Sequence, residues 1–130
     1  MTGDLATRDV LLLAADLSER RLLFGELQET GYQVLPVAGL SVALGALLQG
    51  LVKPRLILIN VEGDEHATPR SVESLMGAAP HVPVILVVGA IGRSHWEPLR
   101  GRVAELLSRP ITFGEIVEAV KRILPLTRTV

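Results

Sequence analysis

Residues 10–34 read VLLLAADLSERRLLFGELQETGYQV, and this stretch decides the fold class. It opens on Val10–Ala14, a continuous apolar run that is typical of a strand covered on both faces. Ser18–Thr30 follows with apolar side chains at helical spacing, and Gly31 is a natural helix stop. The stretch therefore predicts a buried strand followed by an amphipathic helix.

The same alternation of a short apolar run and a helical segment recurs along the chain, five times in all. The further strands are expected at Tyr32–Val37, Arg55–Val61, Val82–Val88 and Val103–Leu107. The first of these should lie at a sheet edge, because Pro36 has no amide proton for a ladder. The further helices are expected at Leu40–Leu51, at 68–79 behind Thr68 and Pro69, in a short segment where Ser94 and Glu97 have capping-box spacing, and at 112–124 behind a Thr112–Glu115 capping box.

One segment could be mistaken for a membrane span, because Leu35 to Val52 is almost free of charge. It contains a proline, three glycines and a change of period, so we interpret it as a strand, a turn and a helix. The helix should place one stripe of leucines on the core, namely Leu40, Leu44, Leu47, Leu48 and Leu51.

Alternating strands and helices with buried strands predict an α/β fold, a three-layer (βα)5 sandwich around a parallel sheet. Right-handed crossovers and five strands favour the strand order 2-1-3-4-5, with helices 1 and 5 on one face and helices 2, 3 and 4 on the other. In such sheets ligands bind beyond the carboxyl ends of the strands. The residues to inspect therefore follow the strands.

Composition narrows the class of function. Apolar residues make up 48% of the 130 residues, which excludes a disordered chain, and the net charge of −1 gives no basic excess for nucleic acid. The absence of cysteine excludes disulfides and thiolate chemistry, and a cytoplasmic setting is expected. The loop after the first strand, AADLSE, has no glycine, which argues against a nucleotide-binding loop and hence a cofactor. His66, His81 and His95 share no metal-ligand spacing.

Residues 10–34 resemble the opening of a response-regulator receiver domain. PRLILIN at 54–60 resembles the third strand of that family, PVILVVG at 83–89 its fourth, and LLSRP at 106–110 its fifth strand with the lysine–proline junction. The resemblance covers about residues 9–124, so we expect residues 1–130 to form a single receiver-like domain. It also implies a cis peptide bond before Pro110.

In that family, a carboxylate on strand 3 accepts a phosphoryl group, two carboxylates after strand 1 hold Mg²⁺, and a hydroxyl and a lysine assist. The matching positions here are Asn60, Ala14 and Ala15, Val88, and Arg109. An amide is not a usable nucleophile, and methyl groups offer Mg²⁺ nothing. We therefore predict a degenerate phosphorylation pocket, with no catalytic residue, no metal and no enzyme activity.

Several acids remain near the pocket, and their role is open at this stage: Asp16, Glu62, Asp64 and Glu65. They could form a rebuilt cation site, or a solvated loop with Asp16 favourably placed at a helix N-terminus. A salt bridge from Arg109 to Asp16 is a third possibility.

The resemblance also implies where a partner would bind, on the surface of helix 4, strand 5 and helix 5. We expect Trp96 near the centre of this face, with Arg100, Arg102, Glu115 and Glu118 around it; the alternative is that Trp96 packs against its own domain. The favoured function is a pseudo-receiver that binds a protein partner or itself, without nucleic acid or membrane. The alternatives are a small-molecule module that uses the uncharged pocket, and an active receiver with Glu62 or Asp64 as acceptor.

Overall fold

The computed structural model describes residues 7–126, and its centre is a five-stranded, fully parallel sheet in the order β2-β1-β3-β4-β5. This is the predicted order. The strands are β1 (Thr7–Leu13), β2 (Val34–Val37), β3 (Lys53–Asn60), β4 (Val84–Val88) and β5 (Glu105–Ser108). Pro36 does lie on an edge strand, paired with Leu12 of β1.

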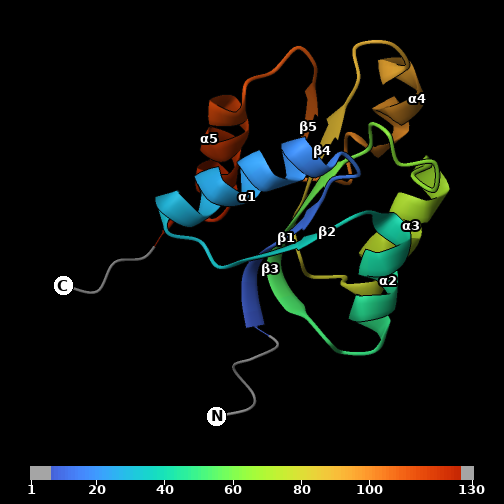
Figure 1. Cartoon of the computed structure of the whole chain (residues 1–130). Helices are drawn as coiled ribbons and strands as arrows, with labels where there is room; N and C mark the ends of the chain where they lie inside the picture. The colour runs from blue at the N-terminus through green and yellow to red at the C-terminus, as the bar shows by residue number, and fades with distance from the viewer. Residues whose placement is uncertain (1–6, 127–130) are drawn as a thin grey trace.

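Helices cover both faces of the sheet, as Figure 1 shows: α1 and α5 lie on one side, and α2, α3 and α4 on the other. Their bounds are α1 (Leu17–Thr30), α2 (Leu40–Leu48), α3 (Pro69–Ala78), α4 (Arg93–Trp96), the 3-10 turn η2 (Glu97–Leu99) and α5 (Phe113–Ile123). The predicted α/β three-layer arrangement is confirmed. None of the helices within residues 7–126 is long and apolar enough to cross a bilayer.

The sheet separates two apolar cores, because successive side chains of a strand point to opposite faces. Leu56 and Leu58 of β3 pack with α1 and α5, whereas Ile57 and Ile59 of the same strand pack with α2, α3 and α4. All four side chains are fully buried. This double burial explains why the strands are apolar at every position.

Side-chain caps fix where three of the helices begin. The Asp16 carboxylate accepts a hydrogen bond from the Glu19 amide at the start of α1, as expected for an acid at a helix N-terminus. Thr68 and Thr112 both form capping boxes, with Ser71 and Glu115 respectively. The Thr112–Glu115 box had been predicted from its spacing.

Three local expectations are wrong. Ser94 does not cap α4, which begins at Arg93 after a left-handed Gly92 and has no side-chain cap. The fifth strand begins at Glu105 and not at Val103, because the Val103 amide bonds the Leu99 carbonyl in a turn. Helix α2 is also shorter than predicted, so its leucine stripe is not continuous.

The early end of α2 leaves two leucines outside the core. Gly50 adopts a positive φ of 70°, which turns the chain after Leu48. Leu48 is 70% exposed and Leu51 is 65% exposed, whereas Leu40 and Ala43 are buried. The helix therefore has an apolar inner face and an uncharged outer face with exposed apolar side chains.

Candidate functional site

The carboxyl edge of the sheet brings the predicted pocket residues together. Ala14 directly follows β1, Asn60 ends β3 and Val88 ends β4, and all three are buried. Arg109 follows β5, and its amide bonds the Val88 carbonyl at 2.9 Å. The peptide bond from Arg109 to Pro110 is cis, as the resemblance implied.

The Asn60 side chain is 4% exposed, and both of its polar atoms have partners. The amide nitrogen donates to the Glu19 carboxylate from the first turn of α1. The amide oxygen accepts from the Glu62 backbone N–H at 3.1 Å. The amide group is therefore held in one orientation by the protein itself.

Arg109 contacts two carboxylates next to the Asn60 side chain, those of Glu19 and Glu62. Its terminal nitrogen donates to Glu19 Oε1, the same oxygen that accepts from Asn60. Its Nε lies 2.8 Å from Glu62 Oε1, an ion pair without the angle of a hydrogen bond. The Arg109 and Glu19 side chains are about one-fifth exposed, whereas that of Glu62 is 54% exposed. We call Glu19, Asn60, Glu62 and Arg109 the pocket network.

Of the possibilities left open for Asp16, the helix N-terminus is the one observed: its carboxylate accepts from the Glu19 amide at 2.8 Å, and the salt bridge to Arg109 is not formed. That cap places Glu19 in the first turn of α1, from where its side chain reaches Asn60 and Arg109. Sequence reasoning missed Glu19. Glu19 follows the helix-capping Asp16 by three residues, and this spacing was the signal in the sequence that could have identified it.

A second arginine occupies the end of β1. Arg20 Nη1 donates to the Ala14 carbonyl at 2.7 Å and lies 3.4 Å from the Ala15 carbonyl. The side chains of Ala14 and Ala15 carry no oxygen for a metal ion, and Arg20 already binds their backbone carbonyls. Within residues 7–126, no group of three His, Asp or Glu side chains is arranged to hold a metal ion.

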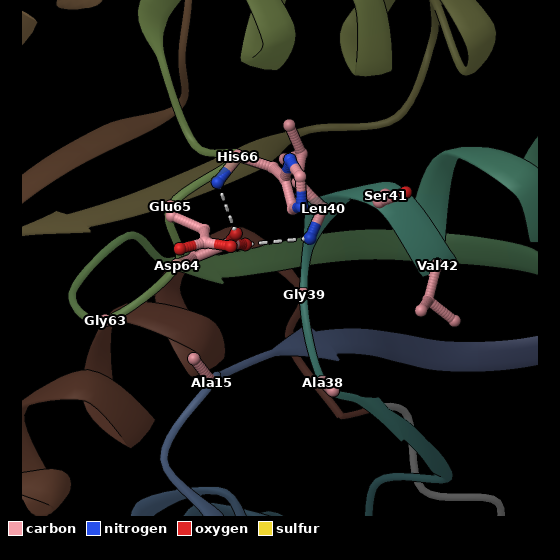
Figure 2. A pocket seen from close by; sticks show the side chains of 10 residues that line it. All are labelled: Ala15, Ala38, Gly39, Leu40, Ser41, Val42, Gly63, Asp64, Glu65 and His66. Atoms are coloured by element: carbon pink, nitrogen blue, oxygen red, sulfur yellow. Dashed lines mark hydrogen bonds between the residues drawn. The ribbon is translucent and has the colours of Figure 1, made fainter.

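A separate pocket of about 420 Å³ lies beside this network, between the start of α2 and the loop after β3 (Figure 2). Asp64 holds the two segments together: its Oδ2 accepts from the Leu40 amide at 2.8 Å and its Oδ1 from the His66 amide at 3.0 Å. Gly39 allows this approach, because a Cβ there would lie 2.7 Å from Asp64 Oδ2. The residues that line this pocket are Ala15, Ala38, Gly39, Leu40, Ser41, Val42, Gly63, Asp64, Glu65 and His66.

The predicted partner face is differently organised from what the sequence suggested. Trp96, the last residue of α4, is 7% exposed and packs into the core on this side of the sheet. The His95 ring lies edge-on to the Trp96 ring, with their centroids 5.6 Å apart. The placement of Trp96 on the surface is wrong, because η2 continues the turn of α4 and buries Leu99 beside it. The face itself stays a prediction.

The four charged residues predicted around Trp96 make pairs within the chain. Arg100 and Arg102 contact Glu97 and Glu73 respectively, and the Arg100 hydrogen bond lowers the pKa of Glu97 to about 2. The backbone hydrogen bond from Thr112 lowers the pKa of Glu115, and Glu118 lies 3.2 Å from Lys121.

No protein-family model and no curated protein matches this sequence. Solved structures do match. A receiver domain protein from Clostridium thermocellum has a TM-score of 0.76 at 15% identity, covering 92% of this chain and 94% of that chain. The receiver domain of NtrX from Brucella abortus has 0.74 at 18%, covering 92% and 100%. A chain described as adenylate cyclase from Rhodopirellula baltica has 0.78 at 16%, covering 92% and 87%. The chain therefore has the fold of receiver domains.

Proposed function

We propose that the protein is a non-catalytic pseudo-receiver, a protein-interaction module of two-component-type signal transduction that is not phosphorylated on aspartate. The receiver fold supports the signalling class. The observation that carries the rest is the pocket network: where the family has its phosphoryl acceptor, this chain has a buried amide whose two polar atoms are already bonded.

The chemistry of phosphoryl transfer explains why this network supports loss of the reaction. Transfer needs a nucleophile and cations that are free to neutralise the charge on the moving phosphoryl oxygens. Asn60 offers no carboxylate, and Val88 offers no hydroxyl. Arg109 already contacts Glu19 and Glu62, so its charge is balanced within the protein.

Acetyl phosphate and Mg²⁺, followed by intact-mass spectrometry, test this proposal. We expect the chain to keep its unmodified mass while an active receiver domain in the same tube gains a phosphoryl group. Asn60→Asp should also stay unmodified, because the new carboxylate would face Glu19 and still lack carboxylates at Ala14 and Ala15. A stoichiometric, hydroxylamine-labile adduct would overturn the proposal, and peptide mapping would show whether Glu62 or Asp64 carries it.

The face that the family implies, formed by α4, β5 and α5, was expected to bind a protein partner or a second copy of the chain, and we propose it as the surface for a protein partner. Its charged residues are exposed and paired within the chain, so their replacement should act mostly on association rate and salt dependence. Arg100→Glu together with Glu118→Lys, tested by surface plasmon resonance against a panel of purified histidine-kinase cytoplasmic domains, measures this. Unchanged binding by that variant would remove the face from consideration.

The alternative function is a small-molecule module, expected to use an uncharged pocket at the carboxyl ends of the strands. Because Glu19, Glu62 and Arg109 make that pocket charged and both polar atoms of Asn60 are bonded, we place the ligand instead in the pocket of Figure 2. Native mass spectrometry of freshly purified protein tests it: a bound species above the 14.0 kDa chain that Val42→Trp removes would favour it. The match to a chain described as adenylate cyclase adds no activity here, since fold alone does not determine function.

A further inference from the structure

The outward side of α2 carries no charge and several large apolar groups. We define the α2 face as the outward residues of this helix and the turn after it. Val42 is 57% exposed, Leu48 is 70% exposed and Leu51 is 65% exposed. No residue from 30 to 52 is charged, so the polar side chains that this segment supplies to the surface are the uncharged Ser41 and Gln49. The α2 face consists of Ser41, Val42, Gly45, Leu48, Gln49 and Leu51.

We propose that the α2 face binds a second copy of this chain, with the two α2 helices antiparallel about a twofold axis at Gly45. This inference rests on the proposed function, since it names a partner for an interaction module. Val42 and Leu48 are equally spaced on either side of Gly45 along the sequence. A twofold axis at Gly45 therefore places Val42 of one copy opposite Leu48 of the other, and Ser41 opposite Gln49.

Gly45 leaves space for the two helices to approach each other at the twofold axis. A Cβ built on Gly45 would meet no heavy atom within 4 Å, so the surface at the centre of α2 is open. A residue without a side chain lets the backbone of a second helix come close, with the larger side chains on either side as packing groups. Leu48 and Val42 would then fill the space beside the axis from both copies.

The charges at the two ends of α2 fit the same antiparallel arrangement. Glu65 belongs to the loop after β3 and lies near the first turn of α2. It lines the pocket of Figure 2 together with Ser41 and Val42. Lys53 lies past the other end, on the strand side that carries Ile57 and Ile59 toward α2. Both side chains are exposed, and neither makes an ion pair with a residue of the described part of the chain. An antiparallel pair of α2 helices brings Lys53 of each copy toward Glu65 of the other copy.

A second copy explains this surface better than a lipid bilayer does. Helices that lie on membranes combine Lys or Arg on the polar face with Trp, Phe or Leu on the other. Residues 40–52 contain leucines but no Lys or Arg. The three exposed apolar side chains are few for an interface of about 800 Å² per partner, so we expect a reversible dimer with a dissociation constant in roughly the micromolar range.

Sedimentation of the full chain over a concentration series tests the proposal. We expect a monomer–dimer equilibrium in which Leu48→Glu raises the dissociation constant at least about tenfold, because a carboxylate would be buried on both sides of the axis. Leu22→Glu is the matched control: Leu22 is 58% exposed on α1, away from the α2 face, and its replacement should leave the equilibrium unchanged. Both leucines are outside the core, so the melting curves should stay close to that of the wild type.

Two further sets of variants test the geometry. Lys53→Glu and Glu65→Lys should each weaken the dimer, and the double swap should restore it, which only an antiparallel pairing of these two residues predicts. Because the chain has no cysteine, Gly45→Cys should form a disulfide-linked dimer under mild oxidation, whereas Gly25→Cys, an equally open helical site on α1, should not.

The outcomes separate this inference from the proposed function. A chain that stays monomeric up to about 1 mM, or a dimer that Leu48→Glu does not weaken, overturns the α2 pairing whatever the phosphorylation result. Vesicle binding by a monomer would do the same in favour of a lipid surface. A chain that accepts a phosphoryl group and still dimerises through α2 overturns the pseudo-receiver proposal alone.

Discussion

Removal of the Glu19 carboxylate should destabilise the fold mainly through Arg109. Breaking a buried ion pair costs about 3–5 kcal/mol and an exposed pair about 0–1 kcal/mol. The Glu19 and Arg109 side chains are about one-fifth exposed, and Glu19→Ala also leaves the buried Asn60 amide without its acceptor. We therefore expect Glu19→Ala to lower the free energy of unfolding by about 2–3 kcal/mol. Glu62 is 54% exposed, so Glu62→Ala should cost at most about 0.5 kcal/mol.

Urea denaturation followed by tryptophan fluorescence measures these differences, because Trp96 is the one tryptophan of the chain and is buried. Double-mutant cycles with Arg109→Ala should give a coupling free energy of about 1.5–2 kcal/mol for Glu19 and below about 0.5 kcal/mol for Glu62. Glu29→Ala, on the exposed side of the same helix, is the control and should change stability by less than about 0.5 kcal/mol. Equal couplings for Glu19 and Glu62 would show that the exposure argument is wrong.

Three other predictions follow from single side chains. Trp96→Ala should lower the free energy of unfolding by about 3 kcal/mol and leave self-association unchanged, since the ring is 7% exposed; a change in sedimentation without a lower melting temperature would contradict this. Gly39→Ala should cost about 1–2 kcal/mol by displacing Asp64 from the start of α2, whereas Gly25→Ala, with open space around it, should stabilise the fold by roughly 0.5 kcal/mol or more, both measured by urea titration. Burial raises the pKa of Tyr32 above its ordinary value of 10.0, so its contribution to stability is present below pH 10 and lost as pH rises further; Tyr32→Phe should remove this alkaline dependence in melting curves, and an unaltered pH profile would exclude Tyr32 as the source.

The strand order and the layering were predictable because they depend on signals that are local and repeated. Each apolar run such as 55–61 is followed by a helix-period segment, and parallel crossovers then leave few topologies. The carboxyl edge of the sheet followed from that topology, so the sequence alone placed Asn60 and Arg109 in one pocket.

The partners within that edge could not be predicted in the same way. Arg109 and Glu19 are 90 residues apart, and which nearby acid an arginine meets depends on helix orientation at the scale of one turn. The surface position of Trp96 was wrong for a similar reason, because the burial of a four-residue helix depends on how the next turn packs. The exposure of Leu48 depended on where α2 stops, and glycine conformation at Gly50 decided that.

The pocket network supplies the positive charge at the carboxyl edge of the sheet from a side chain, Arg109, and not from an ion in solution. A metal ion bound from solution occupies its site only in proportion to its free concentration and affinity. Arg109 is a counter-ion attached to the backbone, so its effective concentration at Glu19 is fixed by the fold. Chelators, dilution and a change in the supply of divalent ions leave such a counter-ion in place. In the pseudo-receiver that we propose, the conformation of this edge is therefore set by the chain itself and needs no bound ion.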